Sequence, residues 1–141
     1  MSIGKKIGAM AAAFVLQLAG MYVIHDVWLK TDYELTASLW RSPAEINHRM
    51  WALMIATAIY AIAVVLIYVR GVEYKPWVGQ GIRFGVLLAL ATTVYVSIAA
   101  WVMVPVPHTL PMKWIIGEGG LCILLGLLVE AITPPKSASA S

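Results

Sequence analysis

Residues Trp114–Ile132 read WIIGEGGLCILLGLLVEAI, an apolar run that is interrupted by only two charged side chains. A helix of this length, rising 1.5 Å per residue, spans roughly 30 Å of hydrocarbon. Three similar runs precede it, at Ile7–Leu29, Met50–Val69 and Phe84–Val104. The sequence therefore predicts an all-α, polytopic membrane protein with four transmembrane helices.

The composition leaves little room for anything besides these helices. The chain has 141 residues, of which 61% are hydrophobic and 12% charged, and the charges concentrate between the apolar runs. A hydrophobic share this high is far above that of soluble domains. We expect one four-helix transmembrane domain over residues 1–132 and a flexible tail at residues 133–141. The first run is expected to be a retained helix, because it exceeds the apolar part of a signal peptide.

The loop charges predict an orientation in the membrane. Basic residues favour the cytoplasmic side, and short connections favour antiparallel neighbouring helices. One set of loops carries Lys5, Lys6, Arg70, Lys75, Arg83 and Lys136, and the other carries Lys30, Arg41, Arg49 and Lys113. We therefore predict an up-down-up-down bundle with both termini in the cytoplasm. The loops at residues 29–49 and 105–113 would then face outward.

Local signals mark where helices begin and end. Ser42-Pro43-Ala44-Glu45 is typical of a capping box, so the second helix is expected to begin near Pro43. Pro105 and Pro107 are expected to end the third helix. A belt of interfacial tryptophans is expected near the outer boundary, at Trp28, Trp40, Trp51, Trp101 and Trp114. The alternative interpretation of these residues is a ligand pocket lined by tryptophans.

Small residues predict where helices approach closely. Gly81 and Gly85 have the GxxxG spacing, and the last run presents a glycine-rich face that includes Gly126. Small residues allow two helix backbones to come into contact inside a membrane. The Gly81–Gly85 pair could serve such a contact within the chain or a dimer of two chains.

Several polar side chains share helix faces inside the predicted spans. Residues four apart lie on one face of a helix, and these sets are Gln17, Met21 and His25, then Met50, Met54, Thr57 and Ala61, and then Thr93 with Ser97. We expect these faces to point into the bundle, where they either bond between helices or line a narrow polar path or a quinone-like pocket. Glu118 is expected to lie against the first helix or to reach the headgroups. Glu130 is expected to extend to the membrane surface or to pair with Arg70 or Arg83.

The three histidines fall at the predicted outer side and suggest a metal or haem site. Imidazoles combined with carboxylates are suitable ligands for zinc, iron or copper. The candidate ligands are His25, His108, Glu118 and His48. His48 lies about 200° around its helix from Met50, so its own face would point toward lipid or a partner. Ordinary interfacial histidines are the competing interpretation, and that interpretation needs no cofactor.

Other function classes find no support in the sequence. A net charge of +3 with no basic run does not indicate nucleic-acid binding. The single cysteine, Cys122, excludes an internal disulfide and a thiolate cluster, and its position in the last run is typical of a small buried residue. No serine elbow, Cys–His pairing or phosphate loop is present, which favours a protein that is not an enzyme.

The chain resembles a widespread family of small, uncharacterised bacterial membrane proteins with four spans. The resemblance covers residues 19–131 and is strongest in the loop between the second and third helices. It is carried by His25-Asp26-Val27-Trp28-Leu29 with Tyr33, by Leu39-Trp40-Arg41, by Gly71–Trp77, by Gly79–Gly85, and by Lys113-Trp114 with Glu118. The resemblance implies a four-helix fold in the bacterial inner membrane and assigns no catalytic residue.

Three functions are compatible with these observations. The first is a non-catalytic accessory or structural subunit of a membrane complex, which would bind other membrane subunits or a second copy of itself. The second is a redox protein with a haem or a transition metal at the outer histidines. The third is a small oligomeric transporter or channel in which Gln17, Thr57, Thr93, Ser97 and Glu118 line the route.

Overall fold

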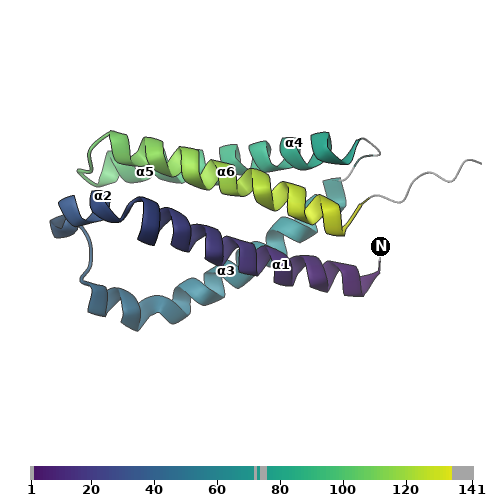
Figure 1. Ribbon diagram of the computed structural model, residues 1–141, viewed down its shortest axis with the longest axis horizontal. Coiled ribbons are helices and arrows are strands. Elements are labelled where there is room, and N and C mark those ends of the chain that lie inside the picture. The colour runs from purple at the N-terminus through teal and green to yellow at the C-terminus, as the bar shows by residue number, and fades with distance from the viewer. Residues whose placement is uncertain (1, 72, 74–75, 135–141) are drawn as a thin grey trace, which may run out of the picture.

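The computed structural model describes residues 2–71, 73 and 76–134, which form helices and no strand (Figure 1). Four helical segments are long and apolar enough to cross a membrane, at Ile3–Trp28, Pro43–Gly71, Val78–Met103 and Thr109–Ile132. The prediction of an all-α bundle of four spans is therefore confirmed, and the chain has the architecture of a multi-pass membrane protein. Each helix begins several residues before the apolar run that predicted it.

Two of the four spans contain a π-helical segment. The first span consists of α1 (Ile3–Tyr22) and the π-helix η1 (Val23–Trp28). The third consists of α4 (Trp77–Ala89), the π-helix η3 (Leu90–Val94) and α5 (Tyr95–Met103). The second and fourth spans are the uninterrupted helices α3 (Pro43–Gly71) and α6 (Thr109–Ile132).

A short segment folds back over one end of the bundle, which we call the cap. It consists of α2 (Lys30–Leu35) and the 3-10 helix η2 (Ala37–Leu39), and it connects η1 to α3. The capping box after it is confirmed, because the Ser42 backbone N–H donates to Glu45 Oε2 at 3.1 Å and the Glu45 N–H donates to Ser42 Oγ. The third span ends at Met103, before Pro105, as predicted.

Helix α6 lies at the centre of the packing, and it contacts α1 on one side and α4 with α5 on the other. Its closest neighbour is α4, where Gly81 and Gly85 face Gly126. A Cβ atom added at Gly81 would lie 3.0 Å from the Cα of Leu127. The GxxxG pair is therefore used inside the chain, where it brings the two backbones together, and the alternative of a dimer contact through it is wrong.

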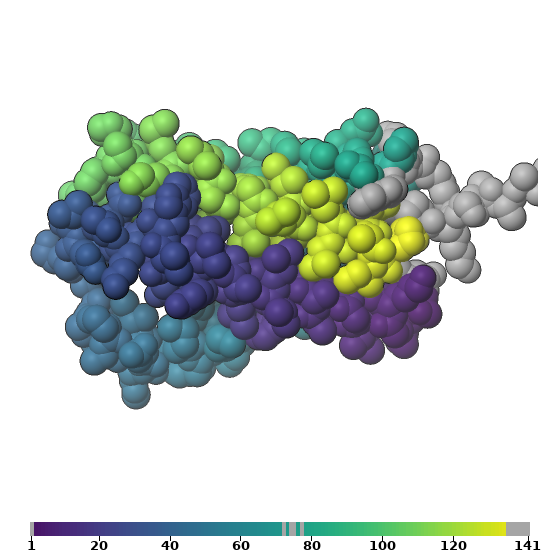
Figure 2. All heavy atoms as spheres, viewed as in Figure 1, coloured from purple at the N-terminus to yellow at the C-terminus, as the bar shows by residue number. Residues whose placement is uncertain are grey.

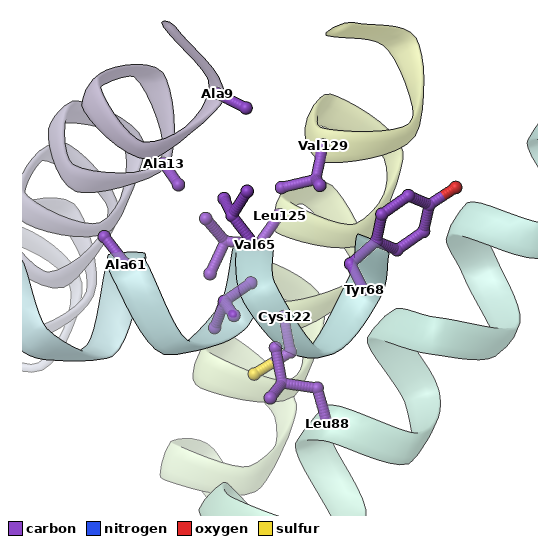
Figure 3. Close-up of a cluster of buried hydrophobic side chains, with 10 residues drawn as sticks. Ala9, Ala13, Ala61, Val65, Tyr68, Leu88, Cys122, Leu125 and Val129 are labelled. Carbon is purple, nitrogen blue, oxygen red and sulfur yellow. The ribbon is translucent and has the colours of Figure 1, made fainter. Parts of the chain in front are cut away.

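The largest hydrophobic core lies at the centre of the bundle, where α1, α3, α4 and α6 meet (Figure 3). Ala9, Ala13 and Ala61 provide small surfaces that let α1 and α3 approach, and the branched side chains of Val65 and Leu125 fill the space beside them. The predicted inner face of α3 is thus correct from Thr57 onward, since Thr57 and Ala61 are both buried.

The first half of α3 diverges from the bundle. Every residue from 41 to 56 is exposed, and Figure 2 shows this part of the chain protruding at the lower left. Met50 and Met54 are 38% and 36% exposed, so the prediction that they point into the bundle is wrong. Helix α3 packs against the bundle only from Thr57 onward. The helical stripe that includes Met50 and Met54 therefore begins before the packed part of the helix. His48 is exposed, as its face predicted.

The predicted tail lies mostly outside the described residues, which end at residue 134. Thr133 belongs to the fold: it is buried, and its hydroxyl donates to the Val129 carbonyl at 2.6 Å. The domain therefore includes the first residue that the sequence assigned to the tail.

Candidate functional site

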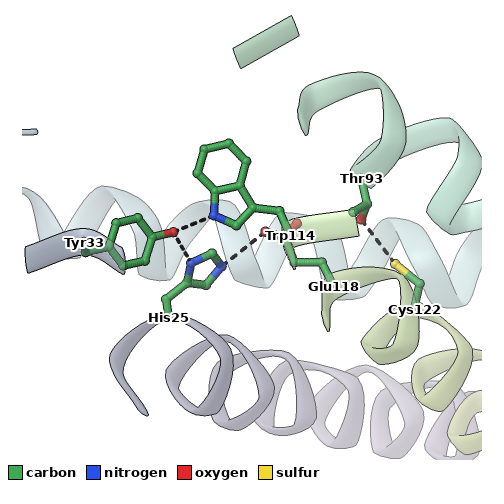
Figure 4. Close-up of polar contacts among 6 residues, drawn as sticks. All are labelled: His25, Tyr33, Thr93, Trp114, Glu118 and Cys122. Carbon is green, nitrogen blue, oxygen red and sulfur yellow. Dashed lines mark hydrogen bonds and ion pairs between the residues drawn. The ribbon is translucent and has the colours of Figure 1, made fainter. Parts of the chain in front are cut away.

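Glu118 is the last member of a series of polar contacts at the cap end of the bundle (Figure 4). Its Oε1 lies 3.2 Å from His25 Nε2, and His25 Nδ1 lies 2.6 Å from the Tyr33 hydroxyl. The Trp114 Nε1–H donates to that same hydroxyl at 2.7 Å. The prediction that Glu118 lies against the first helix is confirmed, since His25 belongs to η1.

The donor and acceptor groups of these side chains fix the direction of each hydrogen bond in the series. Trp114 can only donate, so the Tyr33 oxygen accepts from it and the Tyr33 proton is free to go to His25 Nδ1. A proton on His25 Nε2 then donates to the Glu118 carboxylate. Trp114 is only 7% exposed, so its ring packs inside the protein and takes part in this series of hydrogen bonds.

Burial keeps Tyr33 neutral. The loss of solvent around the phenol raises the pKa of Tyr33 to about 12, and the hydrogen bond from Trp114 lowers that pKa by a smaller amount. A neutral Tyr33 both accepts from Trp114 and donates to His25. The residue therefore carries hydrogen bonds between the cap and the site at every physiological pH.

The cap is attached to α6 by an ion pair. Lys113 Nζ lies 2.7 and 2.8 Å from the two carboxylate oxygens of Asp32 in α2. Trp40 directly follows the cap; its Nε1–H donates to Thr36 Oγ1 at 2.9 Å, and its ring packs edge-on against the rings of Tyr33 and Trp114. These contacts hold Tyr33 over His25.

A cavity of about 130 Å³ lies on the other side of Glu118. Its walls come from α1, α3, η3, α5 and α6, and its polar lining residues are Gln17, Tyr60, Thr92, Thr93, Glu118 and Cys122, with Val96 and Leu121 completing it. The thiol of Cys122 lies 3.7 Å from the Tyr60 hydroxyl and 3.7 Å from that of Thr93. Cys122 is buried, as predicted, but its neighbours are hydroxyls as well as apolar groups.

Both π-helical segments border this region. The extra residue in a π turn changes which side chains face a neighbouring helix, and such turns occur frequently at functional sites. The η1 segment carries His25, and its end is fixed by the Leu29 N–H, which donates to the Ile24 carbonyl at 2.9 Å. The η3 segment carries Thr92 and Thr93. The sequence gives no pattern from which these two segments could be predicted.

The candidate metal ligands are not gathered into one cluster. The structure brings His25 and Glu118 together, whereas His48 and His108 are exposed on α3 and at the start of α6. Within residues 2–71, 73 and 76–134, no group of three or more His, Cys, Asp or Glu side chains is close enough to hold a metal ion. The metal site stays a prediction. Of its four candidate ligands, His25 and Glu118 belong to the candidate site described here.

A second buried carboxyl group lies at the opposite end of α6. Glu130 is fully buried, so the prediction that it extends to the surface is wrong. Its Oε2 accepts from Gln80 Nε2 at 3.0 Å, and Gln80 Nε2 also lies 2.9 Å from the Tyr68 hydroxyl. Among the described residues, Glu130 Oε1 has no hydrogen-bond partner. A layer that includes Val64, Val65 and Leu125 is buried in the core between the two ends of α6.

Sequence reasoning found part of this site. Gln17, His25, Thr93 and Glu118 were all expected to face the interior or the outer site, and they line the cavity or the chain beside it. Tyr33, Tyr60 and Trp114 were missed as site residues. The clearest signal that could have revealed Tyr33 is its position in the short amphipathic segment Asp32–Trp40, which a cap must bring back toward the bundle.

The chain was compared with protein-family models, with curated proteins and with solved structures. No family model, curated protein or solved structure matches the chain.

Proposed function

We propose that the protein binds a small hydrogen-bond-donating ligand inside the membrane at Glu118 and exchanges a proton between this site and the water at the cap end. It would thus act as a small proton-coupled carrier. The observation that carries the proposal is the double position of Glu118, which lines the cavity and also contacts His25. The side chain is 24% exposed, so it is available to a ligand.

The position of Glu118 in a membrane span supports a functional role. An ionisable side chain within hydrocarbon is costly, and such residues often mark substrate paths or proton relays. Glu118 lies nine residues into α6, or about 13 Å along the helix axis. Helix α6 begins before the apolar run, and counted from Trp114, where that run starts, Glu118 lies about 6 Å deep, or roughly one helical turn.

The contacts of His25 support the proton exchange. An imidazole accepts a proton at one nitrogen while it releases one from the other, which makes histidine suited to proton transfer near neutral pH. Here one nitrogen faces Glu118 and the other faces Tyr33 in the cap. With the hydrogen bonds directed as above, a proton passes from the Tyr33 side through His25 to Glu118, and the return of a proton from Glu118 uses the other His25 tautomer, in which Nε2 accepts.

The surroundings of this carrier follow from the same reasoning. A four-helix protomer encloses little volume, so transport would use a homo-oligomer. We propose the bacterial inner membrane as its location, with both termini in the cytoplasm, in line with the loop charges and with the resemblance to the family of small four-span proteins. The apolar layer in the core would separate the Glu118 site from the Glu130 end in this conformation.

The test measures charge movement in proteoliposomes on a solid-supported membrane. Small alcohols, amines and phenols are applied as separate classes to the wild-type protein, to Glu118→Gln and to Glu34→Gln, a matched control because Glu34 is exposed in the cap. We expect a saturable current for at least one class, lost in Glu118→Gln and kept in Glu34→Gln. A current that is absent for every class, or that is unchanged in Glu118→Gln, would contradict the proposal.

A second candidate function is supported by the first half of α3. This segment is exposed on every side, and it carries large apolar residues such as Trp51 and Leu53. An accessory subunit would use such a helix to bind another membrane protein. Affinity purification from native membranes after mild solubilisation should then recover a partner in constant proportion, and repeated recovery of the chain alone would remove this candidate.

A further inference from the structure

The cavity at Glu118 has one open side. Helix α1 packs on α3 and on α6, and α6 packs on η3 and on α5, so these contacts close three of the four sides. Among the described residues, α3 and α5 both line the cavity but do not pack closely on each other. The opening therefore lies between α3 and α5, where the Val96 side chain is 59% exposed.

This opening faces the lipid. Tyr60 lies about 16 Å along the helix axis from the end of the second span, and Val96 lies about 10 Å from the end of the third, so both are inside their spans. The other exposed residues of α5 include Ile98 and Val102, which lie on its other faces and whose side chains are also suited to hydrocarbon. A molecule that passes between α3 and α5 thus comes from the bilayer rather than from water.

The size of the cavity limits what can enter it. Binding pockets for whole drug-sized ligands measure about 300–1,000 Å³, whereas a cavity of about 150 Å³ accommodates one benzene ring. At about 130 Å³, the present cavity holds one small ring or a head group of that size. The remainder of a larger ligand must stay outside, in the lipid between the two helices.

The cavity presents polar groups to such a ring at two heights along the axis of α6. Glu118 and Cys122 are four residues apart on α6, which separates them by about one turn, or roughly 5–6 Å. The upper level offers a carboxylate, and the lower level offers the hydroxyls of Tyr60 and Thr93 around the thiol. A ring with oxygens at opposite positions can bond at both levels, whereas an amine head would use Glu118 alone.

We infer that the cavity binds the hydroxyaromatic head of a membrane-dissolved quinol, whose apolar tail leaves between α3 and α5. This inference rests on the proposed ligand site at Glu118 and names the class of its ligand. The quinol O–H donates to the Glu118 carboxylate, while the second oxygen bonds with the hydroxyls of Tyr60 and Thr93. The oxidised quinone has a carbonyl in place of the O–H group, so its oxygen and the carboxylate would both be acceptors. The site therefore selects the reduced form.

The test compares binding of decyl-tailed benzoquinol and decyl-tailed benzoquinone to the protein in lipid nanodiscs under anaerobic conditions. We expect the quinol to bind at least tenfold more tightly than the quinone in the wild-type protein and in the control Glu34→Gln. In Glu118→Gln the preference should fall to near unity, because the amide can donate to a carbonyl. Val96→Trp should weaken quinol binding by narrowing the opening, whereas Val102→Trp, on another face of α5, should not.

The outcomes separate this inference from the proposed function. Equal binding of quinol and quinone to the wild-type protein would overturn the inference, as would a preference that survives in Glu118→Gln. If neither compound binds while small alcohols or amines still give Glu118-dependent currents, the quinol inference fails and the carrier proposal stands. If Glu118→Gln changes neither the binding nor the currents, both fail.

Discussion

Gly126 of α6 and Gly85 of α4 are in backbone contact: a Cβ atom added at Gly126 would lie 2.9 Å from the Gly85 nitrogen. The atoms that would be displaced belong to a helix backbone and cannot rotate away. The two glycines therefore set the distance between the most closely packed pair of helices.

This contact predicts an asymmetry among the glycines of α6. Gly126→Ala should destabilise the fold by about 1–3 kcal/mol, the usual cost of overpacking. Gly120→Ala is the matched control, because a Cβ there meets nothing within 4 Å and alanine gains up to about 1 kcal/mol in a helix. The free energy of unfolding in mixed micelles checks both values. Equal stabilities of the two variants would contradict the packing of α4 on α6.

The burial of Tyr33 predicts a stability change in alkali. The folded phenol has a pKa of about 12, whereas a phenol in the unfolded chain ionises near 10. The unfolded state therefore loses its proton first, so the contribution of Tyr33 is complete below pH 10 and declines as the pH rises toward 12.

The measurement takes the difference between the wild-type protein and Tyr33→Phe, which cancels the titration of all other groups. We expect the stability advantage of the wild-type protein to shrink by at most about 2 kcal/mol over this interval. Ultraviolet absorbance of tyrosinate should show the matching late ionisation. A difference that does not depend on pH would show that Tyr33 is not buried.

Local sequence signals predicted the parts of the fold that depend on local physics. The four spans follow from hydrophobic length, and the start of α3 follows from the bonds between Ser42 and Glu45. The buried positions Thr93 and Ser97 follow from helical spacing combined with polarity. Each of these features needs only a short stretch of chain to be specified.

The parts that were missed depend on how whole helices are oriented. Met50 and Met54 share a face with Thr57, yet they are exposed because α3 joins the bundle only from Thr57 onward. His25 meets Glu118 across 93 residues of sequence, through a π turn that no local pattern announces. A site assembled by tertiary packing from three or more helices therefore requires a structure.

The buried hydrogen bond between Gln80 and Glu130 predicts that replacing either residue by leucine changes the free energy of unfolding by a different amount. Gln80→Leu leaves the Glu130 carboxyl group buried without its hydrogen bond, which should cost about 1–3 kcal/mol. Glu130→Leu removes the buried group itself, while Gln80 keeps its bond to Tyr68, so the stability should change by less.

A double variant provides the control for this pair. Glu130→Leu combined with Gln80→Leu should be more stable than Gln80→Leu alone, because no carboxyl group is then left unpaired. Unfolding of all three variants in the same micelles decides the question. If adding Glu130→Leu to Gln80→Leu lowers the free energy of unfolding further, the Glu130 carboxyl group stabilises the fold through another contact.

The ion pair between Lys113 and Asp32 predicts a change in the pKa of Tyr33 with an informative sign. Removing a cation near a phenol makes ionisation harder, so electrostatics alone would raise that pKa in Lys113→Met. If the ion pair holds the cap in place, its loss instead exposes Tyr33 and lowers the pKa toward 10. We expect the fall, because Asp32 and Tyr33 are neighbours in α2, and the Lys113–Asp32 ion pair joins that helix to α6 beside the hydrogen bond between Trp114 and Tyr33. The tyrosinate absorbance of Lys113→Met measures it, and Lys30→Met is the control, since Lys30 is exposed and lies 4.0 Å from Glu34 within the cap. A rise in Lys113→Met would show that the cap is held by the packing of Tyr33, Trp40 and Trp114 without help from the ion pair.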